Sequence, residues 1–326
     1  GSKTGPVAII APVPPPYGGM ALQARDLAQR LSAEGVSGFV IATNPKVLVP
    51  IDKIRGIRTL VQTVVYLFRL FRAVPQVEVV HILAASYFYF FARVMPAILI
   101  SRLFGRRVVL NYRGGEAPRF FSAYGALVRP ILRLASMITV PSSFLVKTFA
   151  EQRLSAVIVP NLIDLDRFRY RLRSPLRPRI LVTRNLETMY NIRMAIRAYE
   201  IVKRHHADAR LDIAGSGTEE TALVAWVKEK GIKDVIFHGA INHQQIPQFL
   251  NSADVLLNPA NVDNLPTSLL EPFASGVAVV PTNVGGIPDL LGDSAAAALV
   301  RPDDHEAMAA LCRRFCHSLR SATIAC

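Results

Sequence analysis

The chain has 326 residues, of which 51% are hydrophobic and 19% are charged. At roughly 150 residues per domain this length predicts two domains, and so large an apolar fraction excludes a mainly disordered chain. The net charge of +14 is uneven, because residues 1–164 carry +12, residues 165–179 carry +5 and residues 180–326 carry −3. A general nucleic-acid-binding protein would spread its positive charge along a groove across the whole protein. The pattern therefore argues against a nucleic-acid partner and places an anionic partner near the first half.

Cysteine and histidine usage indicates the compartment and the absence of a metal centre. The three cysteines, Cys312, Cys316 and Cys326, all lie near the end of the chain. This spacing excludes a disulfide framework and predicts a reducing compartment, so we expect a cytoplasmic protein. No histidine pair has metal-ligand spacing with a carboxylate partner, so we expect no metal site.

Short runs rich in Val, Ile and Leu alternate with helical patterns along the whole chain. They are apolar at nearly every position, as expected of strands covered on both faces. In the first half they are Val7–Ala11, Gly38–Thr43, Glu78–Leu83, Arg107–Asn111, Ile138–Pro141 and Ala156–Pro160. In the second half they are Ile180–Arg184, Leu211–Gly215, Val235–Gly239, Asp254–Pro259, Val277–Pro281 and Ala296–Val300. Six strands per half, alternating with helices, predict two Rossmann-like, doubly wound parallel sheets of the α/β class.

We expect domains at 1–164 and 180–326, joined by a linker at 165–179. The linker is rich in Pro and Arg and lacks apolar periodicity. Ligands of open parallel sheets bind beyond the carboxyl ends of the strands. Two such domains facing each other would place a ligand site in the cleft between them.

The first strand runs into Pro14-Pro15-Pro16-Tyr17-Gly18-Gly19, and a helical pattern follows. Gly18 and Gly19 would let the backbone approach a ligand closely, and the helix start would suit a phosphate. A simple Pro/Gly turn without a ligand explains the same residues, because the loop is neither GxGxxG nor a Walker loop.

The most informative stretch is 254–290, DVLLNPANVDNLPTSLLEPFASGVAVVPTNVGGIPDL. After a predicted buried strand, Asp263 lies in a polar loop, and a helix begins near Pro266. Glu271 follows eight positions after Asp263, inside the first helical turns. Two ionised carboxylates so placed are suited to holding vicinal hydroxyls. Taken singly, Asp263 would be a helix-capping residue and Glu271 a solvated helical one.

This stretch resembles the donor-binding signature of glycosyltransferase family 4, retaining nucleotide-sugar enzymes of GT-B fold. The resemblance extends over nearly the whole chain, through the loop at 14–20, Val159-Pro160-Asn161-Leu162-Ile163-Asp164 and Ala214-Gly215-Ser216-Gly217. It implies hexosyl transfer in bacterial polysaccharide biosynthesis from a UDP- or GDP-linked donor, with no cofactor or metal, to a glycan or lipid-linked acceptor. Family members usually continue with a final helix that crosses back onto the first domain, and we expect that segment to be absent from this sequence.

The resemblance implies a role for each matching residue. Gly18 and Gly19 would face the donor pyrophosphate, and Arg184 would pair with its phosphates. Glu271 would hold the ribose hydroxyls, and Asp263 would contact the transferred sugar. Backbone groups at the helix start would bind phosphate or sugar, and the base would lie near Gly239. The helix-start residues are Leu265, Pro266, Thr267 and Ser268.

Three residues depart from the family pattern. Asp263 stands where a glutamate is usual, so its reach is one methylene shorter. Tyr190 replaces a basic residue six positions after Arg184, which places more of the leaving-group stabilisation on Arg184 and helix dipoles. Arg113 replaces a histidine, and an arginine cannot be a general base at neutral pH. Arg113 would instead stabilise phosphate charge. These departures keep two alternatives open, a non-catalytic nucleotide-sugar- or glycan-binding protein of the same fold and a nucleotide-sugar epimerase.

The basic half contains two stretches with basic and apolar or aromatic residues, 53–72 and 87–107. Basic amphipathic helices of this kind can lie in an anionic membrane interface. Ordinary helices with solvated basic faces are the alternative. The run Ser86–Leu103 is long and apolar, but Arg93 and Pro96 interrupt it, so we do not expect it to span a membrane. The hypothesis is peripheral attachment through residues 53–107 to the inner face of a membrane.

Overall fold

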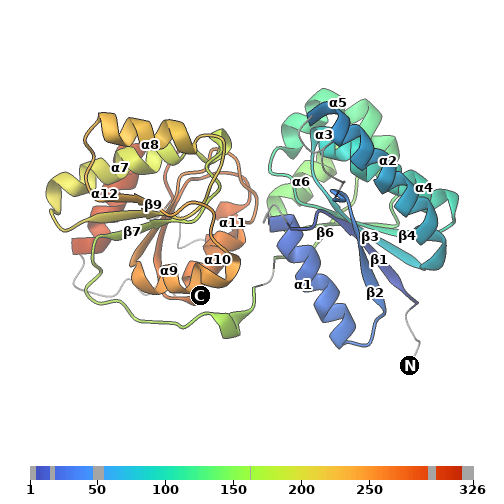
Figure 1. The fold of residues 1–326 in the computed structure, drawn as a ribbon, viewed down its shortest axis with the longest axis horizontal. Helices are drawn as coiled ribbons and strands as arrows, with labels where there is room; N and C mark the ends of the chain where they lie inside the picture. Colours follow the sequence, from blue (N-terminus) through green and yellow to red (C-terminus); the bar gives the residue numbers. More distant parts are fainter. Residues whose placement is uncertain (1–4, 15–18, 47–54, 162, 293–298, 318–326) are drawn as a thin grey trace. The chain divides into compact units, whose positions relative to one another are not determined.

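The computed structural model describes residues 5–14, 19–46, 55–161, 163–292 and 299–317. The chain divides into two compact units, unit 1 at 1–160 and unit 2 at 161–326 (Figure 1). The predicted linker, 165–179, belongs to unit 2. Each unit is an α/β domain built on a parallel sheet, as the alternating sequence pattern predicts.

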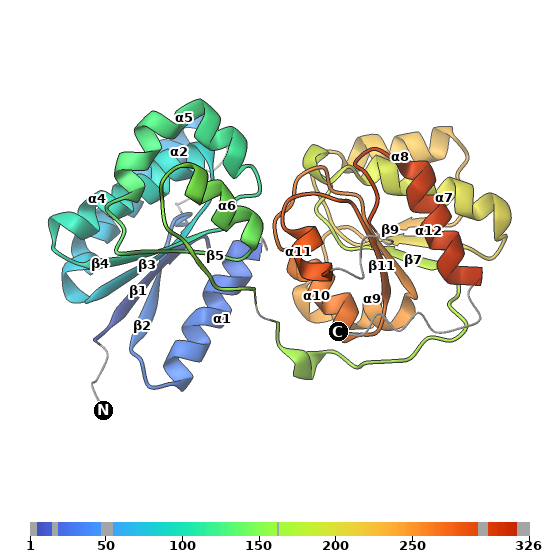
Figure 2. The ribbon, with the colours of Figure 1, turned by 180° about the vertical axis from the view of Figure 1, so that it is seen from behind.

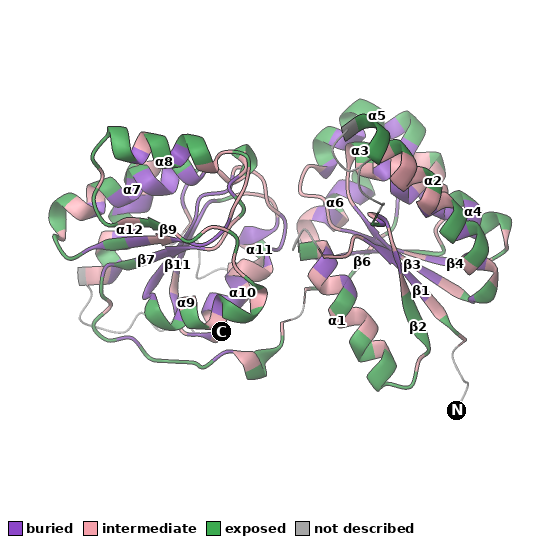
Figure 3. Ribbon diagram, in the orientation of Figure 1, coloured by how far each residue is buried: buried purple, intermediate pink, exposed green. Residues whose placement is uncertain are grey.

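Unit 1 contains six parallel strands in the order β2-β1-β3-β4-β5-β6. Their bounds are β1 Val7–Ala11, β2 Gly38–Ala42, β3 Val79–Ala84, β4 Arg107–Tyr112, β5 Met137–Val140 and β6 Val157–Ile158. All six predicted strands of the first half are therefore confirmed. The central strands are buried because helices cover both faces (Figure 3).

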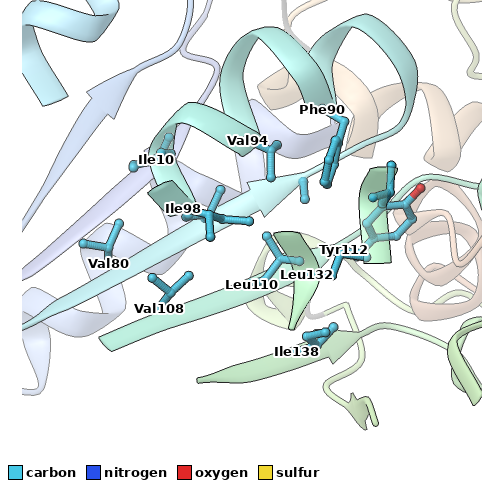
Figure 4. Packing of buried hydrophobic residues seen from close by; sticks show 14 of the residues in the cluster. Ile10, Val80, Phe90, Val94, Ile98, Val108, Leu110, Tyr112, Leu132 and Ile138 are labelled. Carbon is cyan, nitrogen blue, oxygen red and sulfur yellow. The ribbon is translucent and has the colours of Figure 1, made fainter. Parts of the chain in front are cut away.

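Helices lie on both faces of this sheet. They are α1 Gly19–Ala33, α2 Arg55–Ala73, α3 Tyr87–Tyr89, α4 Met95–Leu103, α5 Ala117–Leu132 and α6 Ser143–Glu151, with a 3₁₀ turn Val74–Gln76 and a π-helical turn Phe90–Val94 between α3 and α4. Alternate residues of β1 face opposite cores, because Ile9 and Ala11 pack with α1, whereas Ala8 and Ile10 join the larger core under α2 and α4. In that larger core Phe90, Val94 and Ile98 lie over the strands (Figure 4).

Unit 2 contains five parallel strands in the order β11-β10-β7-β8-β9. Their bounds are β7 Arg179–Val182, β8 Arg210–Ile213, β9 Val235–Phe237, β10 Val255–Asn258 and β11 Ala278–Pro281. The prediction of a sixth strand, Ala296–Val300, falls partly outside the described residues. Val300 forms an isolated parallel bridge with Thr282 at the edge of the sheet.

Two groups of helices cover this second sheet. The helices are α7 Ile192–His205, α8 Glu220–Glu229, α9 Ile246–Ser252, α10 Thr267–Ala274, α11 Ile287–Leu291 and α12 His305–His317. Three short 3₁₀ turns, Leu165–Arg167, Thr188–Tyr190 and His243–Gln245, lie between regular elements. Helices α7, α8 and α12 share one core with the sheet, and α9, α10 and α11 share the other. Figure 2 shows α12 beside α7 on the same face.

The Arg-rich segment 165–179 is anchored to unit 2 by buried polar contacts. The Arg173 side chain is 2% exposed and pairs with Asp254 at 3.2 Å. It also donates to the carbonyl oxygens of Ala253, Leu250 and Ser275. A guanidinium with this many acceptors is held in one position, so the positive charge of Arg173 serves the packing of unit 2.

Candidate functional site

The strand order of unit 2 identifies where a ligand should bind. β7 lies between β8 and β10, and the chain leaves β7 towards α7 but leaves β10 towards α10, on the opposite face. In open α/β sheets such a switch point opens a crevice at the carboxyl ends of the two strands. Arg184 follows β7 and Asp263 follows β10, so both side chains belong to this edge.

Arg184 is the centre of the polar contacts at the switch point. One terminal nitrogen forms an ion pair with the Asp263 carboxylate, and the other donates to the Ser268 hydroxyl at 2.8 Å. Its guanidinium carbon lies 4.1 Å from the centre of the Tyr190 ring, a cation–π contact. The side chains of Arg184 and Asp263 are only 11% and 12% exposed. The structure thus brings together four of the residues that the family resemblance singled out, Arg184, Tyr190, Asp263 and Ser268.

Tyr190 and Asp263 have more specific positions than the sequence indicated. The Tyr190 ring stacks on Arg184 and orients it, although it brings no charge of its own. Asp263 does not cap α10, because the residue preceding that helix is Pro266 and no side chain caps it. One Asp263 oxygen instead accepts the Asn264 backbone N–H at 2.9 Å, and the other binds Arg184.

Two glycines allow the loops around Arg184 and Asp263 to pack closely. A Cβ at Gly285 would lie 1.9 Å from the Asp263 carbonyl oxygen, and Gly285 also has a φ of +55°. A Cβ at Gly215 would lie 2.0 Å from the Arg184 carbonyl oxygen. Both glycines come from the motifs that carried the family resemblance, and here they let backbones approach each other.

Glu271 is buried rather than solvated, since it is only 4% exposed. Its Oε1 lies 2.8 Å from Nε2 of His243. Nδ1 of His243 lies 2.9 Å from Nη1 of Arg167, and Nη2 of Arg167 donates to the His243 carbonyl oxygen at 2.8 Å. Neither His243 nor Arg167 was predicted from the sequence, because neither lies in a recognisable motif and both are distant in sequence from Glu271.

The start of α10 offers a polar surface beside Arg184. The predicted residues Thr267 and Ser268 form its first turn, and no side chain caps it. Backbone N–H groups in a first helical turn lack intrahelical partners and favour anions. The Leu265 carbonyl oxygen accepts a hydrogen bond from the Asn161 side chain, which fixes the preceding loop. Gly239, after β9, has a φ of +66° that favours glycine.

The remaining predicted residues lie in unit 1. Gly18 lies outside the described residues, and Gly19 begins α1, where an added Cβ would have no neighbour within 4 Å. Arg113 follows β4, and its backbone N–H donates to the Ala84 carbonyl oxygen at 2.9 Å. Burial lowers the pKa of Arg113 to about 10. The hypothesis that Gly18, Gly19 and Arg113 share a site with Arg184 stays a prediction.

The described residues form neither a candidate metal site nor a membrane-spanning helix. Within ranges 5–14, 19–46, 55–161, 163–292 and 299–317, no three His, Cys, Asp or Glu side chains gather as a candidate metal site. Across those same ranges, no helix has the length and apolar character needed to cross a membrane.

Two family models match the chain, and together they cover nearly all of it. "Glycosyltransferase Family 4" matches residues 17–167, and "Glycosyl transferases group 1" matches residues 167–322. The chain belongs to glycosyltransferase family 4. Its two parallel-sheet domains are those of the GT-B fold. Sucrose-phosphate synthase from Thermosynechococcus elongatus shares this fold with a TM-score of 0.72 at 17% identity, over 96% of this chain and 90% of that one.

Two further proteins are similar to this family 4 chain. Glycogen synthase from Mycobacterium tuberculosis is 24% identical over 233 residues, which are 67% of this chain and 56% of that protein. The chain thus spans little more than half the length of this curated relative. The structure of S. aureus TarM with Fondaparinux, alpha-GlcNAc-glycerol and UDP has a TM-score of 0.61 at 12% identity, over 80% of this chain and 52% of that one.

Proposed function

We propose that the protein transfers a sugar from a nucleoside diphosphate sugar to a hydroxyl of a glycan or lipid-linked acceptor, with retention of configuration. One observation carries the proposal. A nearly buried arginine and an uncapped helix start meet at the switch point of unit 2, the edge where such sheets bind nucleotides. Membership of glycosyltransferase family 4 supports the same reaction class.

Arg184 would hold the donor phosphates. An arginine makes bidentate contacts to phosphate and keeps its charge at any physiological pH. The first turn of α10 and the Ser268 hydroxyl, 2.8 Å from Arg184, would add donors on the same side. These groups would stabilise the negative charge that develops on the diphosphate as the sugar leaves.

The ion pair between Arg184 and Asp263 limits what Asp263 can do. One of its oxygens binds Arg184 and the other accepts the Asn264 backbone N–H, so both oxygens already have partners in unit 2. The proton of the acceptor hydroxyl would therefore go to the donor's own β-phosphate, on the face that the leaving group occupies. Attack on that face retains the configuration of the sugar. Asp263 would position the sugar and share the charge of Arg184.

Glu271 would hold the ribose hydroxyls of the donor. Its carboxylate has a second oxygen beside the one that contacts His243, and an ionised carboxylate accepts several hydrogen bonds. The base would lie near Gly239. UDP in the related TarM structure makes UDP the first nucleotide to test, with GDP as the alternative.

A binding and turnover experiment tests this assignment. UDP, GDP and ADP are first compared by thermal shift, and their sugar conjugates are then tested for transfer and hydrolysis. Glu271→Gln should weaken binding of the preferred nucleotide about tenfold or more, the effect of losing a hydrogen bond to a charged group. Glu229→Gln, an exposed glutamate on α8, is the matched control. Unchanged binding in Glu271→Gln would refute the ribose assignment.

A non-catalytic nucleotide-sugar-binding protein is the second candidate. The observation that favours it is Tyr190, which stacks on Arg184 where the family usually has a second positive charge. Binding without transfer or hydrolysis, over the full donor panel and a panel of glycan and lipid-linked acceptors, would establish this alternative. Interconversion of donor sugars without an acceptor would instead indicate an epimerase.

The surface of α2 supports a peripheral attachment to an anionic membrane, which we propose as the acceptor's location. One stripe of this helix is apolar and exposed, with Leu60 at 65% and Phe68 at 67%. The full stripe, the α2 stripe, consists of Ile57, Leu60, Val64, Phe68 and Phe71. Three exposed arginines, Arg58, Arg69 and Arg72, lie on the same helix, and α2 contains no acidic residue. Apolar side chains beside arginines complement the interface of an anionic bilayer.

Vesicle cosedimentation tests the α2 stripe. The protein should bind vesicles that contain phosphatidylglycerol at low salt, more weakly at high salt, and weakly to phosphatidylcholine alone. The double variant Leu60→Ser/Phe68→Ser should bind about 30-fold more weakly, if each side chain contributes about 1 kcal/mol on insertion. Leu172→Ser, 64% exposed in unit 2, is the control. Equal binding by both variants, or no binding even at low salt, would refute the attachment.

A further inference from the structure

We infer that Arg167 and His243 are positioning residues, which fix the Glu271 carboxylate so that its second oxygen, Oε2, faces the ribose of the donor. The inference rests on the proposed function of Glu271. The observation behind it is a continuous chain of contacts from Arg167 through the His243 ring to Glu271.

The chemistry of these contacts determines the tautomer of His243. A guanidinium has only hydrogen-bond donors, so the contact of 2.9 Å between Nη1 of Arg167 and Nδ1 of His243 requires a lone pair on Nδ1. The ring proton of the neutral imidazole then sits on Nε2. Nε2 lies 2.8 Å from Oε1 of Glu271 and donates to it. Arg167 thus turns His243 into a fixed donor for one carboxylate oxygen.

The surrounding backbone holds this chain in place. His243 begins a 3₁₀ turn that Asn242 and Gln245 close with a reciprocal capping box. The second nitrogen of Arg167 binds the His243 carbonyl oxygen, so both the ring and the backbone are held by one side chain. The His243 and Glu271 side chains are 18% and 6% exposed, so little water competes for these hydrogen bonds.

His243 holds the Glu271 carboxylate in one orientation before the donor binds. With Oε1 occupied by His243, rotation of the Glu271 carboxylate would break a hydrogen bond to a charged group. Oε2 therefore remains available for the ribose hydroxyls without reorganisation on binding, which favours affinity. Arg167 lies in the segment 165–179 of unit 2, so this segment takes part in forming the donor site.

Nitrogen chemical shifts of the histidine ring give a test that does not depend on catalysis. Long-range ¹H–¹⁵N spectra of the intact protein distinguish the two neutral tautomers. His243, assigned by comparison with His243→Gln, should be the Nε2–H tautomer in the wild type. Arg167→Gln should shift it towards a mixture. An Nδ1–H tautomer in the wild type would overturn the inference.

Binding of UDP, GDP or ADP, whichever gives the largest thermal shift, provides the functional readout. His243→Leu should weaken binding about tenfold, whereas His243→Gln, whose amide nitrogen can replace Nε2–H, should restore most of it. If Glu271→Gln weakens binding but His243→Leu does not, the positioning inference fails and the proposed function stands. If Glu271→Gln has no effect, the ribose assignment fails and the inference falls with it. If none of the three nucleotides binds, the proposed function fails, and the tautomer measurement still decides whether Arg167 orients His243.

Discussion

Replacement of Asp263 by asparagine should change stability and nucleotide affinity in opposite directions. The Arg184 and Asp263 side chains are 11% and 12% exposed, so their ion pair is largely shielded from water. Breaking a buried pair costs about 3–5 kcal/mol when one partner is removed. Asparagine keeps a polar oxygen in place, so we expect Asp263→Asn to lower the free energy of unfolding by about 2 kcal/mol. The expected decrease in Tm is roughly 4–8 °C.

The same substitution frees the positive charge of Arg184 for the diphosphate. At an effective dielectric constant of about 20, two unit charges about 4 Å apart interact by about 4 kcal/mol. Asp263 and the diphosphate are both negative and repel each other. If about a third of this 4 kcal/mol acts as repulsion in the wild type, removing the Asp263 charge strengthens nucleotide binding about tenfold. Free UDP and GDP are the right probes, because they lack the sugar that Asp263 is proposed to position.

Titration calorimetry and chemical denaturation measure the two effects on the same samples. Glu229→Gln removes an exposed carboxylate from α8 and controls for the change in net charge. Asp263→Asn should bind the nucleoside diphosphate more tightly than this control, yet lose transfer activity. Equal or weaker binding by Asp263→Asn would refute the view that Asp263 and the donor phosphates compete for Arg184.

Two further substitutions test the loop packing and the interior of unit 1. Gly285→Ala should destabilise unit 2 by more than about 2 kcal/mol, because its Cβ would lie 1.9 Å from the Asp263 carbonyl oxygen. Gly231→Ala is the control, because Gly231 also has a positive φ, +63°, but an added Cβ would have no neighbour within 4 Å. An equal loss of Tm in both variants would contradict the role of close packing at Gly285. Burial, with a smaller effect of the Arg113 charge, lowers the pKa of His81 to about 4, below the 6.5 of the unfolded chain. The unfolded state therefore binds the proton first, and stability that is complete above pH 6.5 should fall by about 2 kcal/mol between pH 7 and pH 5. Denaturation of His81→Gln at both pH values should show a smaller loss, and an unchanged loss would exclude His81 as its source.

Local sequence patterns were sufficient to predict the fold class and the residue types of the candidate site. A parallel strand that is buried on both faces needs apolar residues at nearly every position, so it appears in the sequence as an apolar run between turn signals. All six strands of unit 1 were therefore predictable. The motif around Asp263 and Glu271 indicated two carboxylates near a helix start. These are local properties, which need no knowledge of which strands are neighbours.

Which side chains are in contact depends on the three-dimensional arrangement of the strands and helices. Arg184 and Asp263 are 79 positions apart, and they pair because β7 and β10 are adjacent strands with opposite crossovers. Glu271 contacts His243, which is 28 positions away in the sequence, and His243 contacts Arg167, which is 76 positions away. The segment 165–179, predicted as a linker from its composition, is held to unit 2 by Arg173 and Asp254. Such contacts depend on strand order and helix packing, which the periodicity of a single segment does not encode.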